Sequence, residues 1–435
     1  METKRHKLLV VSVDALFYKD LEYIRNMPNF KRVLEKGSYA KGMRAVYPSL
    51  TYPCHVAIMC SRYPEESGIY HNEKMEPGNP TPEWFWWYSD LKCKTILDYA
   101  GEHGLTTAAF NWPVLAGCEN IDYLVGEIWE RESQGERQRE LYEKACSPAI
   151  MDGIYQKYEK QLVRNQTPYY DEFVCLCAEE VVRRYQPDVN FIHFSQVDHK
   201  RHATGLYNTT VREALASCDG RLGRLLQAYE DAGILEDTNV IVLGDHGHLA
   251  VERLFQPNVL FVQEGLIRLD EQGRIEDYDA YCNSAALSCQ VVLKNPQDEQ
   301  VRKKVESILN EWVIDHTIGV EAVYNRQQAQ QLFHLTGNFE YVLEGCDATS
   351  FGNAVTGPVY ATTDTGNYKF SVTSHGHLPD KGNDPAFIAC GPDIRQGVVL
   401  ERGSLMDEAP TFARLLGFEF PEPHGRVLEE MLKSL

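Results

Sequence analysis

The chain has 435 residues, of which 43% are hydrophobic, and its formal net charge at pH 7 is −20. This length supports a large core with insertions on one framework, and the acidic balance argues against a nucleic-acid polymer or an anionic membrane as a partner. No apolar stretch approaches the length of a membrane span, and the 12 cysteines include no Cys-x-x-Cys pair. With no export signal after Met1, these features lead us to expect a cytoplasmic protein with free thiols.

Short apolar runs alternate with helical patterns along much of the chain. Such alternation is typical of right-handed crossovers and of a largely parallel sheet that is covered on both faces. Amphipathic patterns over 170–184 and 212–231 predict two of the intervening helices. We therefore expect an α/β fold with a mostly parallel central sheet sandwiched by helices. The runs that predict its strands are Lys7–Val13, Thr106–Asn111, Asn190–Phe194, Asn239–Leu243 and Ala386–Cys390.

The stretch from about residue 258 to residue 364 interrupts this alternation. It reads as a smaller α+β insertion, with an amphipathic helix over Asp298–Trp312 and a strand over Glu340–Glu344. We accordingly predict the first part of a catalytic core over 1–257, an inserted α+β cap subdomain over 258–364, and the closing part of the core over 365–435.

Two short stretches place a carboxylate beside an imidazole, the ligand mixture that suits Zn²⁺ and its neighbours. Asp198 and His202 are four residues apart, so one helical turn directs both side chains toward the same ion. Asp245 and His246 follow an apolar run of strand length, which places them at a strand's carboxyl end, where open α/β sheets build their sites. The two stretches together indicate the halves of a bimetal hydrolase site.

Three further residues supply the remaining chemistry. Asp14 ends the first predicted strand, although a cap of the next helix is an alternative there. Thr51 lies in a Pro-bracketed turn before an apolar helical run, where backbone N–H groups can face an anion; an ordinary N-cap threonine is the alternative. His375 lies in a Gly- and Pro-rich turn after a short strand, a better setting for a ligand than for a structural histidine.

These motifs, in this order, resemble the alkaline phosphatase superfamily and, within it, the nucleotide pyrophosphatase/phosphodiesterase type. The resemblance extends over nearly the whole chain and is thinnest over about 130–187 and 262–360. It implies an alkaline-phosphatase-like α/β fold. The matching segments are Val11–Asp14, Pro48–His55, Arg62–Asn72, Thr95–Asp98, Asn111–Pro113, Asp198 with His202, Gly244–Gly247, His375–His377 and Gly391–Gly417.

The resemblance also implies how the site is divided. Two divalent metal ions, with Zn²⁺ preferred, are expected as cofactors. Thr51 is expected to attack phosphorus, activated by coordination to one ion, because a free threonine hydroxyl is a feeble nucleophile. Asn72 is expected to donate a hydrogen bond to a phosphoryl oxygen, with an exposed turn asparagine as the alternative. The implied ligands are Asp198, His202 and His375 for one ion, and Asp14, Asp245, His246 and Thr51 for the other.

Several neighbouring residues are assigned no metal. We expect His55, His248 and His377 only to orient the loops of the site. Cys54 stands where the family usually has asparagine, and a packed thiol explains it best. Tyr52, which follows the nucleophile, is expected either to stack on a nucleobase or to belong to the core.

The sequence thus predicts a hydrolase of phosphodiester or pyrophosphate bonds that acts on a small phosphorylated substrate, with a nucleotide as one candidate. A phosphonoacetate-hydrolase-like enzyme or a phosphomonoesterase on the same metal site is the alternative. A sulfatase is disfavoured because the Cys/Ser-x-Pro-x-Arg signature is missing. The sequence does not predict the oligomeric state.

Overall fold

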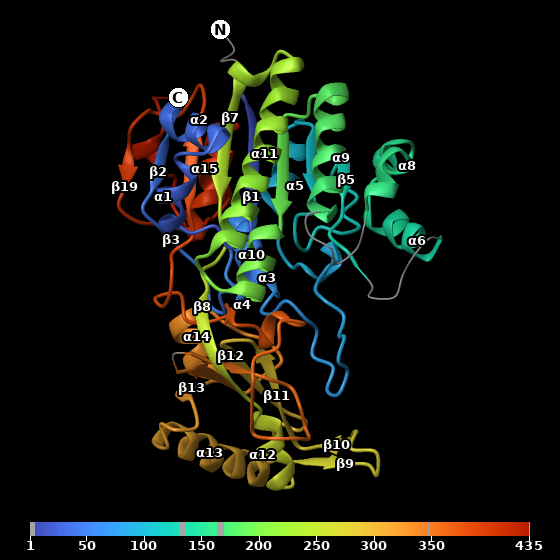
Figure 1. Cartoon of the computed structure of the whole chain (residues 1–435), viewed down its shortest axis with the longest axis vertical. Helices are drawn as coiled ribbons and strands as arrows, with labels where there is room; N and C mark the ends of the chain where they lie inside the picture. The colour runs from blue at the N-terminus through green and yellow to red at the C-terminus, as the bar shows by residue number, and fades with distance from the viewer. Residues whose placement is uncertain (1–4, 130–135, 163–168, 347, 435) are drawn as a thin grey trace.

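The computed structural model describes residues 5–129, 136–162, 169–346 and 348–434. An eight-stranded sheet lies in the upper part of the molecule (Figure 1). Neighbouring strands are parallel, except that the strand after residue 386 runs antiparallel to both of its neighbours. In spatial order the strands are β19 (Val399–Leu400), β2 (Ser38–Ala40), β18 (Phe387–Cys390), β7 (Thr238–Leu243), β1 (Lys7–Val13), β6 (Val189–Phe194), β4 (Thr107–Phe110) and β5 (Tyr123–Val125).

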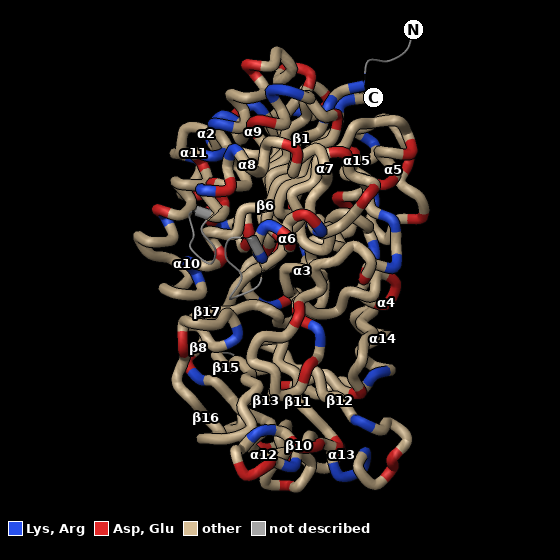
Figure 2. The backbone as a smooth tube through the Cα atoms, turned by 90° about the vertical axis from the view of Figure 1, so that its right-hand side faces the viewer, with Lys and Arg blue, Asp and Glu red and all other residues tan. Residues whose placement is uncertain are grey.

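Helices cover both faces of this sheet. Figure 2 shows the layers edge-on, with α2, α9 and α11 on one side and α5 and α15 on the other. The flanking helices are α2 (Pro28–Lys36), α9 (Tyr169–Tyr185), α10 (Gln196–Thr204), α11 (Thr209–Asp231), α3 (Thr51–Cys60), α5 (Ile96–Glu102) and α15 (Glu408–Leu415). Shorter elements are α1 (Leu21–Ile24), α4 (Pro64–Ser67), α6 (Glu136–Ala145), α7 (Pro148–Met151), α8 (Ile154–Tyr158), β3 (Met43–Arg44) and β20 (Gly403–Ser404).

The burial of the strands explains their sequences. Every residue of β7 is buried, as is every residue of β1 except Lys7, so both strands read as nearly continuous apolar runs. The five strands expected from the sequence are present within a residue or so of the expected bounds, which confirms the mostly parallel α/β sheet. The strand β18 was expected without a direction, and its antiparallel register with β7 pairs Phe387 with Leu243.

The inserted part lies below the sheet in Figure 1 and is built mainly on an antiparallel four-stranded sheet. Its expected helix and strand are both present. The elements from residue 249 to residue 374 are β8 (Leu249–Phe255), α12 (Pro257–Gln263), β9 (Ile267–Leu269), β10 (Ile275–Tyr278), β11 (Ala280–Ala285), β12 (Ser288–Leu293), α13 (Glu299–Ile314), β13 (Val320–Asn325), α14 (Arg326–Phe333), β14 (Tyr341–Gly345), β15 (Ala348–Phe351), β16 (Tyr360–Ala361) and β17 (Thr373–Ser374).

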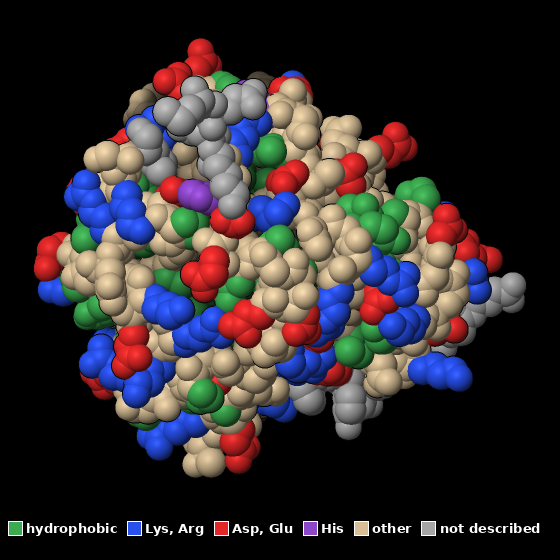
Figure 3. Space-filling view, turned by 90° about the horizontal axis from the view of Figure 1, so that it is seen from above, with side chains coloured by type: hydrophobic (Ala, Val, Ile, Leu, Met, Phe, Trp, Pro, Cys, Tyr) green, Lys and Arg blue, Asp and Glu red, His purple; other side chains and the backbone are tan. Residues whose placement is uncertain are grey.

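The insertion has a hydrophobic cluster of its own. Its buried apolar side chains lie between Phe255 and Phe351, whereas the main cluster draws on residues before 244 and after 385. The boundaries 1–257, 258–364 and 365–435 stay a prediction. In the described ranges, no helix combines the length and the apolarity that crossing a membrane requires. Figure 3 shows basic and acidic side chains intermixed on the end of the molecule farthest from the insertion.

Candidate metal centre

The residues expected to bind metal meet at the carboxyl ends of three adjacent strands. Asp14 follows β1, Asp245 and His246 follow β7, and α10, which carries Asp198, follows β6. Because β1 pairs in parallel with both β6 and β7, these ends share one edge of the sheet. The turns around them are tight. A Cβ atom on Gly244 would lie 2.1 Å from the Leu16 carbonyl oxygen, so only glycine fits immediately before Asp245.

One group of donors consists of four buried side chains whose ligating atoms lie within 4.8 Å of one another: Asp198, His202, His248 and His375. The imidazole Nε2 atoms surround a single carboxylate oxygen. Asp198 Oδ1 lies 2.6 Å from His248 Nε2, 3.2 Å from His202 Nε2 and 3.8 Å from His375 Nε2. Three imidazoles around one carboxylate form a compact nitrogen and oxygen donor set of the kind that binds Zn²⁺.

Backbone contacts orient two of these rings toward the carboxylate. His202 Nδ1 donates to the Thr373 carbonyl oxygen at 2.7 Å, and His375 Nδ1 donates to the Ser49 carbonyl oxygen at 3.2 Å. A neutral imidazole that donates through Nδ1 keeps a lone pair on Nε2. His202 Nε2 is accordingly buried without a hydrogen-bond partner among the described residues. Lone pairs that face a carboxylate repel it unless a cation lies between them, so this geometry suits a metal ion.

The second group consists of Asp14, Asp245 and His246, also buried and within 4.8 Å of one another. His246 Nε2 lies 3.2 Å from Asp14 Oδ1 and 3.3 Å from Asp245 Oδ2, and both of these oxygens lack a hydrogen-bond partner in the described chain. Burial, and then the charge of Asp198, raise the pKa of Asp14 to about 6. Although burial opposes it, the charges of Asp245 and Asp14 raise the pKa of His246 to about 9. The cluster therefore favours added positive charge.

Thr51 joins the second group. It is the first residue of α3 and is 7% exposed, and its Oγ1 lies 3.1 Å from His246 Nε2. His55, one turn along the helix, donates from Nδ1 to the Thr51 carbonyl oxygen at 2.8 Å and lies 3.4 Å from Asp245 Oδ2. His55 thus contacts Thr51 and Asp245 from behind, which is the place of a supporting residue.

Asn72 and Tyr52 lie beside the amino end of α3. Asn72 Oδ1 accepts a hydrogen bond from the Tyr52 backbone N–H at 3.0 Å, and this contact fixes the orientation of the side-chain amide. The Tyr52 ring is completely buried, with its centroid 5.4 Å from that of Trp84 in an edge-on arrangement. In this structure Tyr52 presents no face to solvent. Cys54 is also fully buried, as a packed thiol would be.

The structure also shows residues whose position sequence reasoning did not foresee. His248 was expected only to orient the loops, yet its Nε2 atom lies within the first donor group. His193 and Ser12 were not considered; His193 Nε2 lies 3.3 Å from Asp14 Oδ2, and Ser12 Oγ lies 3.0 Å from His55 Nε2. The repeated histidine in Asp245-His-Gly-His248 was the one available signal. His377 stays outside both groups, with its Nδ1 bonded to the Leu378 carbonyl oxygen at 2.8 Å.

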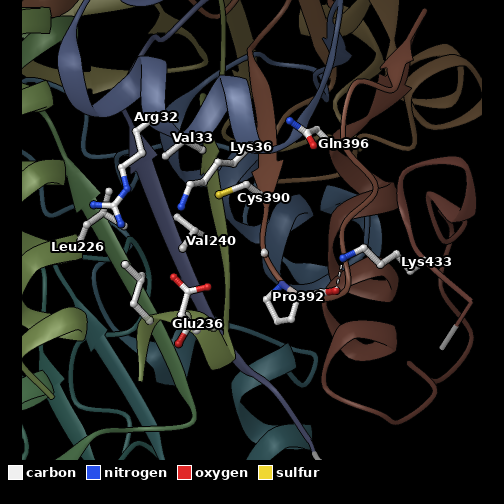
Figure 4. Close-up of a pocket in the computed structure, with 13 residues that line it drawn as sticks. Arg32, Val33, Lys36, Leu226, Glu236, Val240, Cys390, Pro392, Gln396 and Lys433 are labelled. Carbon is white, nitrogen blue, oxygen red and sulfur yellow. Dashed lines mark hydrogen bonds between the residues drawn. The ribbon is translucent and has the colours of Figure 1, made fainter. Parts of the chain in front are cut away.

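A cavity elsewhere in the molecule takes no part in this site. It has a volume of about 330 Å³ and lies beside the amino end of β7, whereas Asp245 follows the carboxyl end of that strand. Figure 4 shows Arg32, Lys36 and Lys433 around it, together with Cys390. The cavity is separated from the metal centre by the length of the strand.

Comparison with known proteins identifies relatives of this chain. The family model for type I phosphodiesterase / nucleotide pyrophosphatase matches residues 8–383. The chain is 23% identical to ectonucleotide pyrophosphatase/phosphodiesterase family member 7 of Rattus norvegicus, in an alignment that covers 99% of this chain and 88% of that protein. It is 25% identical to family member 3 of Mus musculus over 51% of this chain, but that match spans only 22% of the relative's length.

Solved structures show the same fold. Murine ectonucleotide pyrophosphatase/phosphodiesterase 5 superimposes with a TM-score of 0.69 at 16% identity, covering 98% of this chain and 100% of that one. An inactive threonine-to-alanine variant of that murine protein, in complex with AMP, gives a TM-score of 0.67 at 15% identity. These matches confirm the expected alkaline-phosphatase-like α/β fold. The chain belongs to the type I phosphodiesterase / nucleotide pyrophosphatase family.

Proposed function

We propose that this chain is a metal-dependent hydrolase of phosphodiester or pyrophosphate bonds, with Thr51 as its nucleophile. The observation that carries the proposal is the position of the Thr51 hydroxyl, at the amino end of α3 and 3.1 Å from His246 Nε2, beside two groups of buried carboxylate and imidazole donors. Family membership supports the reaction class. The inactive threonine-to-alanine variant solved with AMP supports a threonine in this role.

The donor groups fit two divalent cations, with Zn²⁺ preferred for nitrogen and oxygen ligands of this kind. When bound, the cations supply positive charge that favours the deprotonated threonine and offsets negative charge on the phosphoryl oxygens. Asp14 Oδ1 and Asp245 Oδ2 are buried without a hydrogen-bond partner among the described residues, and the protein alone places no positive charge beside them that a bound cation would supply. The proposed ligands are Asp198, His202 and His375 for one cation, and Asp14, Asp245, His246 and Thr51 for the other.

The protein's own groups then have separate tasks. Thr51 Oγ forms a bond to phosphorus as its proton is lost, and the bond from phosphorus to the departing oxygen breaks. At the start of α3 the Tyr52 N–H is bonded to Asn72 and Pro53 has no N–H, so the Thr51 backbone N–H is the one left to favour an anion there. Because Asn72 Oδ1 is already bonded to Tyr52, its Nδ2 group is left to donate to a phosphoryl oxygen. Water releases the product from Thr51 in a second displacement.

The proposal is tested by hydrolysis rates with Zn²⁺-loaded protein. We expect bis-p-nitrophenyl phosphate and thymidine 5′-p-nitrophenyl phosphate to be cleaved faster than p-nitrophenyl phosphate. Thr51→Ala should lower the diester rate by about 10³-fold or more while the metal content stays unchanged. Thr51→Ser, which keeps a hydroxyl, is the matched control and should retain much of the rate.

Three results would redirect the proposal. Near-normal turnover by Thr51→Ala would contradict the nucleophile. Preference for the monoester would indicate a phosphomonoesterase, and inactivity on all three substrates would indicate a phosphonoacetate-hydrolase-like enzyme.

A further inference from the structure

Glu344 is a buried residue of the inserted part whose side chain bonds to the catalytic core. It lies on β14, between β12 and β13 in the antiparallel sheet, and its side chain is 1% exposed. The Tyr47 hydroxyl donates to Oε2 of this carboxylate at 3.0 Å, and the Leu378 backbone N–H donates to Oε1 at 3.1 Å. The two donors come from segments of the core that lie far apart in the sequence.

The two segments carry functional residues of the proposed site. Tyr47 precedes Thr51 by four residues, and Leu378 follows His375 by three. The segments are also bonded to each other. His375 Nδ1 donates to the Ser49 carbonyl oxygen at 3.2 Å, and the Ser49 hydroxyl donates at 2.8 Å to the backbone carbonyl oxygen two residues beyond His375. The buried carboxylate therefore closes a ring of contacts that contains the turn before Thr51 and the turn that carries His375.

The neighbouring strand of the inserted part reinforces this contact. Ser288 on β12 faces Glu344 in the register of the two strands, and it also lies beside the Tyr47 hydroxyl. The Ser288 hydroxyl donates to the Gly376 carbonyl oxygen at 2.6 Å. A Cβ atom on Gly376 would lie 2.0 Å from the last carbonyl oxygen of β11, so no side chain fits there. The turn that carries His375 thus rests directly on the inserted sheet.

The partners of the carboxylate make it a fixed anchor. Lys381 Nζ balances its charge, at 3.0 Å from Glu344 Oε1 and 2.5 Å from Glu321 Oε2. Because both oxygens of Glu344 have partners, this carboxylate is satisfied by the protein itself and needs no ligand. A buried polar network that is fully bonded holds one arrangement of its members. Since a misplacement of about 1 Å can cost about 100-fold in rate, such an anchor bears on the chemistry.

We propose that Glu344 is a positioning residue for the reaction at Thr51. Through its two bonds it holds the turn before the nucleophile against the turn that carries His375. The inserted part is thus required for the chemical step, beyond the role of a cap over the site. Glu344 belongs to neither donor group, so it acts through the residues that it bonds. This inference rests on the proposed function, because it concerns the step in which Thr51 attacks phosphorus.

The first test removes one hydroxyl group. Tyr47→Phe keeps the ring, which packs edge-on against Phe333 with the centroids 4.9 Å apart, and loses the bond to Glu344. The assay is a single turnover of bis-p-nitrophenyl phosphate by excess Zn²⁺-loaded protein, at about pH 8.5, above the pKa of about 7 to which burial raises Glu344. We expect the maximal rate constant of p-nitrophenol release to fall about 10-fold. The protein concentration that gives half of that rate should stay within about twofold, because a displaced nucleophile leaves ground-state binding intact.

Tyr324→Phe is the matched control for the loss of a tyrosine hydroxyl. The Tyr324 ring also lies 4.9 Å from that of Phe333, and its hydroxyl has no hydrogen-bond partner among the described residues. Its rate constant and its binding should both stay within about twofold of the wild-type values.

The second test asks whether the turn that carries His375 moves as well. Glu344→Ala removes both bonds, whereas Glu344→Gln keeps an oxygen that can accept one of them; Lys381 retains Glu321 as a partner in both variants. We expect the single-turnover rate constant to fall about 100-fold in Glu344→Ala and to be at least about fivefold higher in Glu344→Gln. With Co²⁺ in place of Zn²⁺, visible absorption reports the geometry of the ligands, and Glu344→Ala should change this spectrum while Tyr324→Phe should not.

The outcomes separate this inference from the proposed function. If the wild-type protein cleaves none of the diesters, the proposed function fails. If the wild type cleaves bis-p-nitrophenyl phosphate but Tyr47→Phe lowers the rate constant by less than about threefold, the positioning role is refuted while the hydrolase remains. Weaker binding with an unchanged rate constant would refute it as well. An unchanged Co²⁺ spectrum in Glu344→Ala would refute the link to His375.

Discussion

Arg201 offers a sharp test of how the metal-binding loops are held in place. It lies on α10 between Asp198 and His202, and its side chain is fully buried but belongs to neither donor group. Its Nη2 donates to Asp20 Oδ2 at 2.5 Å, and its Nε donates to the Ala15 carbonyl oxygen at 3.2 Å. The guanidinium group therefore links the helix that carries one set of ligands to the loop that carries Asp14.

The expected loss of stability in Arg201→Met follows from the burial of its ion pair with Asp20. Both partners of the ion pair are almost completely buried, with side-chain exposures of 0% for Arg201 and 1% for Asp20. Burial raises the pKa of Asp20 in spite of the neighbouring guanidinium, which shows how costly its carboxylate is in this place. Removing one partner of a buried pair leaves an uncompensated charge and costs about 3–5 kcal/mol. We expect Arg201→Met to lower the free energy of unfolding by that amount.

A second variant separates the lost charge from the lost packing. Asp20→Asn combined with Arg201→Met leaves no buried charge, so we expect it to recover about 2 kcal/mol or more of the single variant's loss. Urea unfolding followed by tryptophan fluorescence, on metal-free protein, measures both effects. A loss below about 1 kcal/mol for Arg201→Met, or a double variant as unstable as the single one, would refute the reasoning.

Three further predictions concern the same centre and the insertion. His248→Ala should weaken Zn²⁺ binding about 10- to 100-fold, because Asp198 loses its closest partner; unchanged affinity in a competition titration would exclude that role. Chelation should lower the melting temperature and added Zn²⁺ restore it, since the folded protein alone holds the assembled site; a metal-independent transition would contradict this. Burial, opposed by Lys381, raises the pKa of Glu344 from 4.5 to about 7. The folded state therefore binds that proton more tightly, and its stabilising contribution, full below pH 4.5, is lost as the pH rises to about 7. Between pH 4.5 and pH 7, the free energy of unfolding of the wild type should fall by up to about 3 kcal/mol more than that of Glu344→Gln. If urea titrations give the two proteins parallel curves of unfolding free energy against pH, Glu344 does not titrate in that range.

The central strands could be predicted because burial on both faces leaves a plain record in the sequence. The strands β1 and β7 consist mainly of apolar residues, and their direction follows from the right-handed crossovers between them. The edge strands β19 and β5, and β2 next to the edge, have only two or three residues, too few to produce a periodic pattern. The antiparallel direction of β18 is set by its pairing with strands distant in sequence, and no local signal encodes it.

The candidate site also contains residues that could be predicted from the sequence and residues that could not. Asp198 and His202 could be paired from their spacing alone, since one helical turn brings them together. His193 and Ser12, by contrast, follow no spacing rule, because they reach the site from β6 and from β1. Tyr52 could be interpreted as a core residue or as a stacking platform from its sequence. Its complete burial depends on Trp84, which approaches from a separate loop.

The stereochemical course at phosphorus tests the central claim most directly. Each in-line displacement inverts the configuration, so attack by Thr51 followed by attack by water gives overall retention. The measurement uses a p-nitrophenyl phosphorothioate diester of one configuration, hydrolysed in ¹⁸O-labelled water by the Zn²⁺-loaded protein. We predict retention of configuration in the product. Inversion would mean that water attacks the substrate in a single step, and it would contradict the role of Thr51 as the nucleophile.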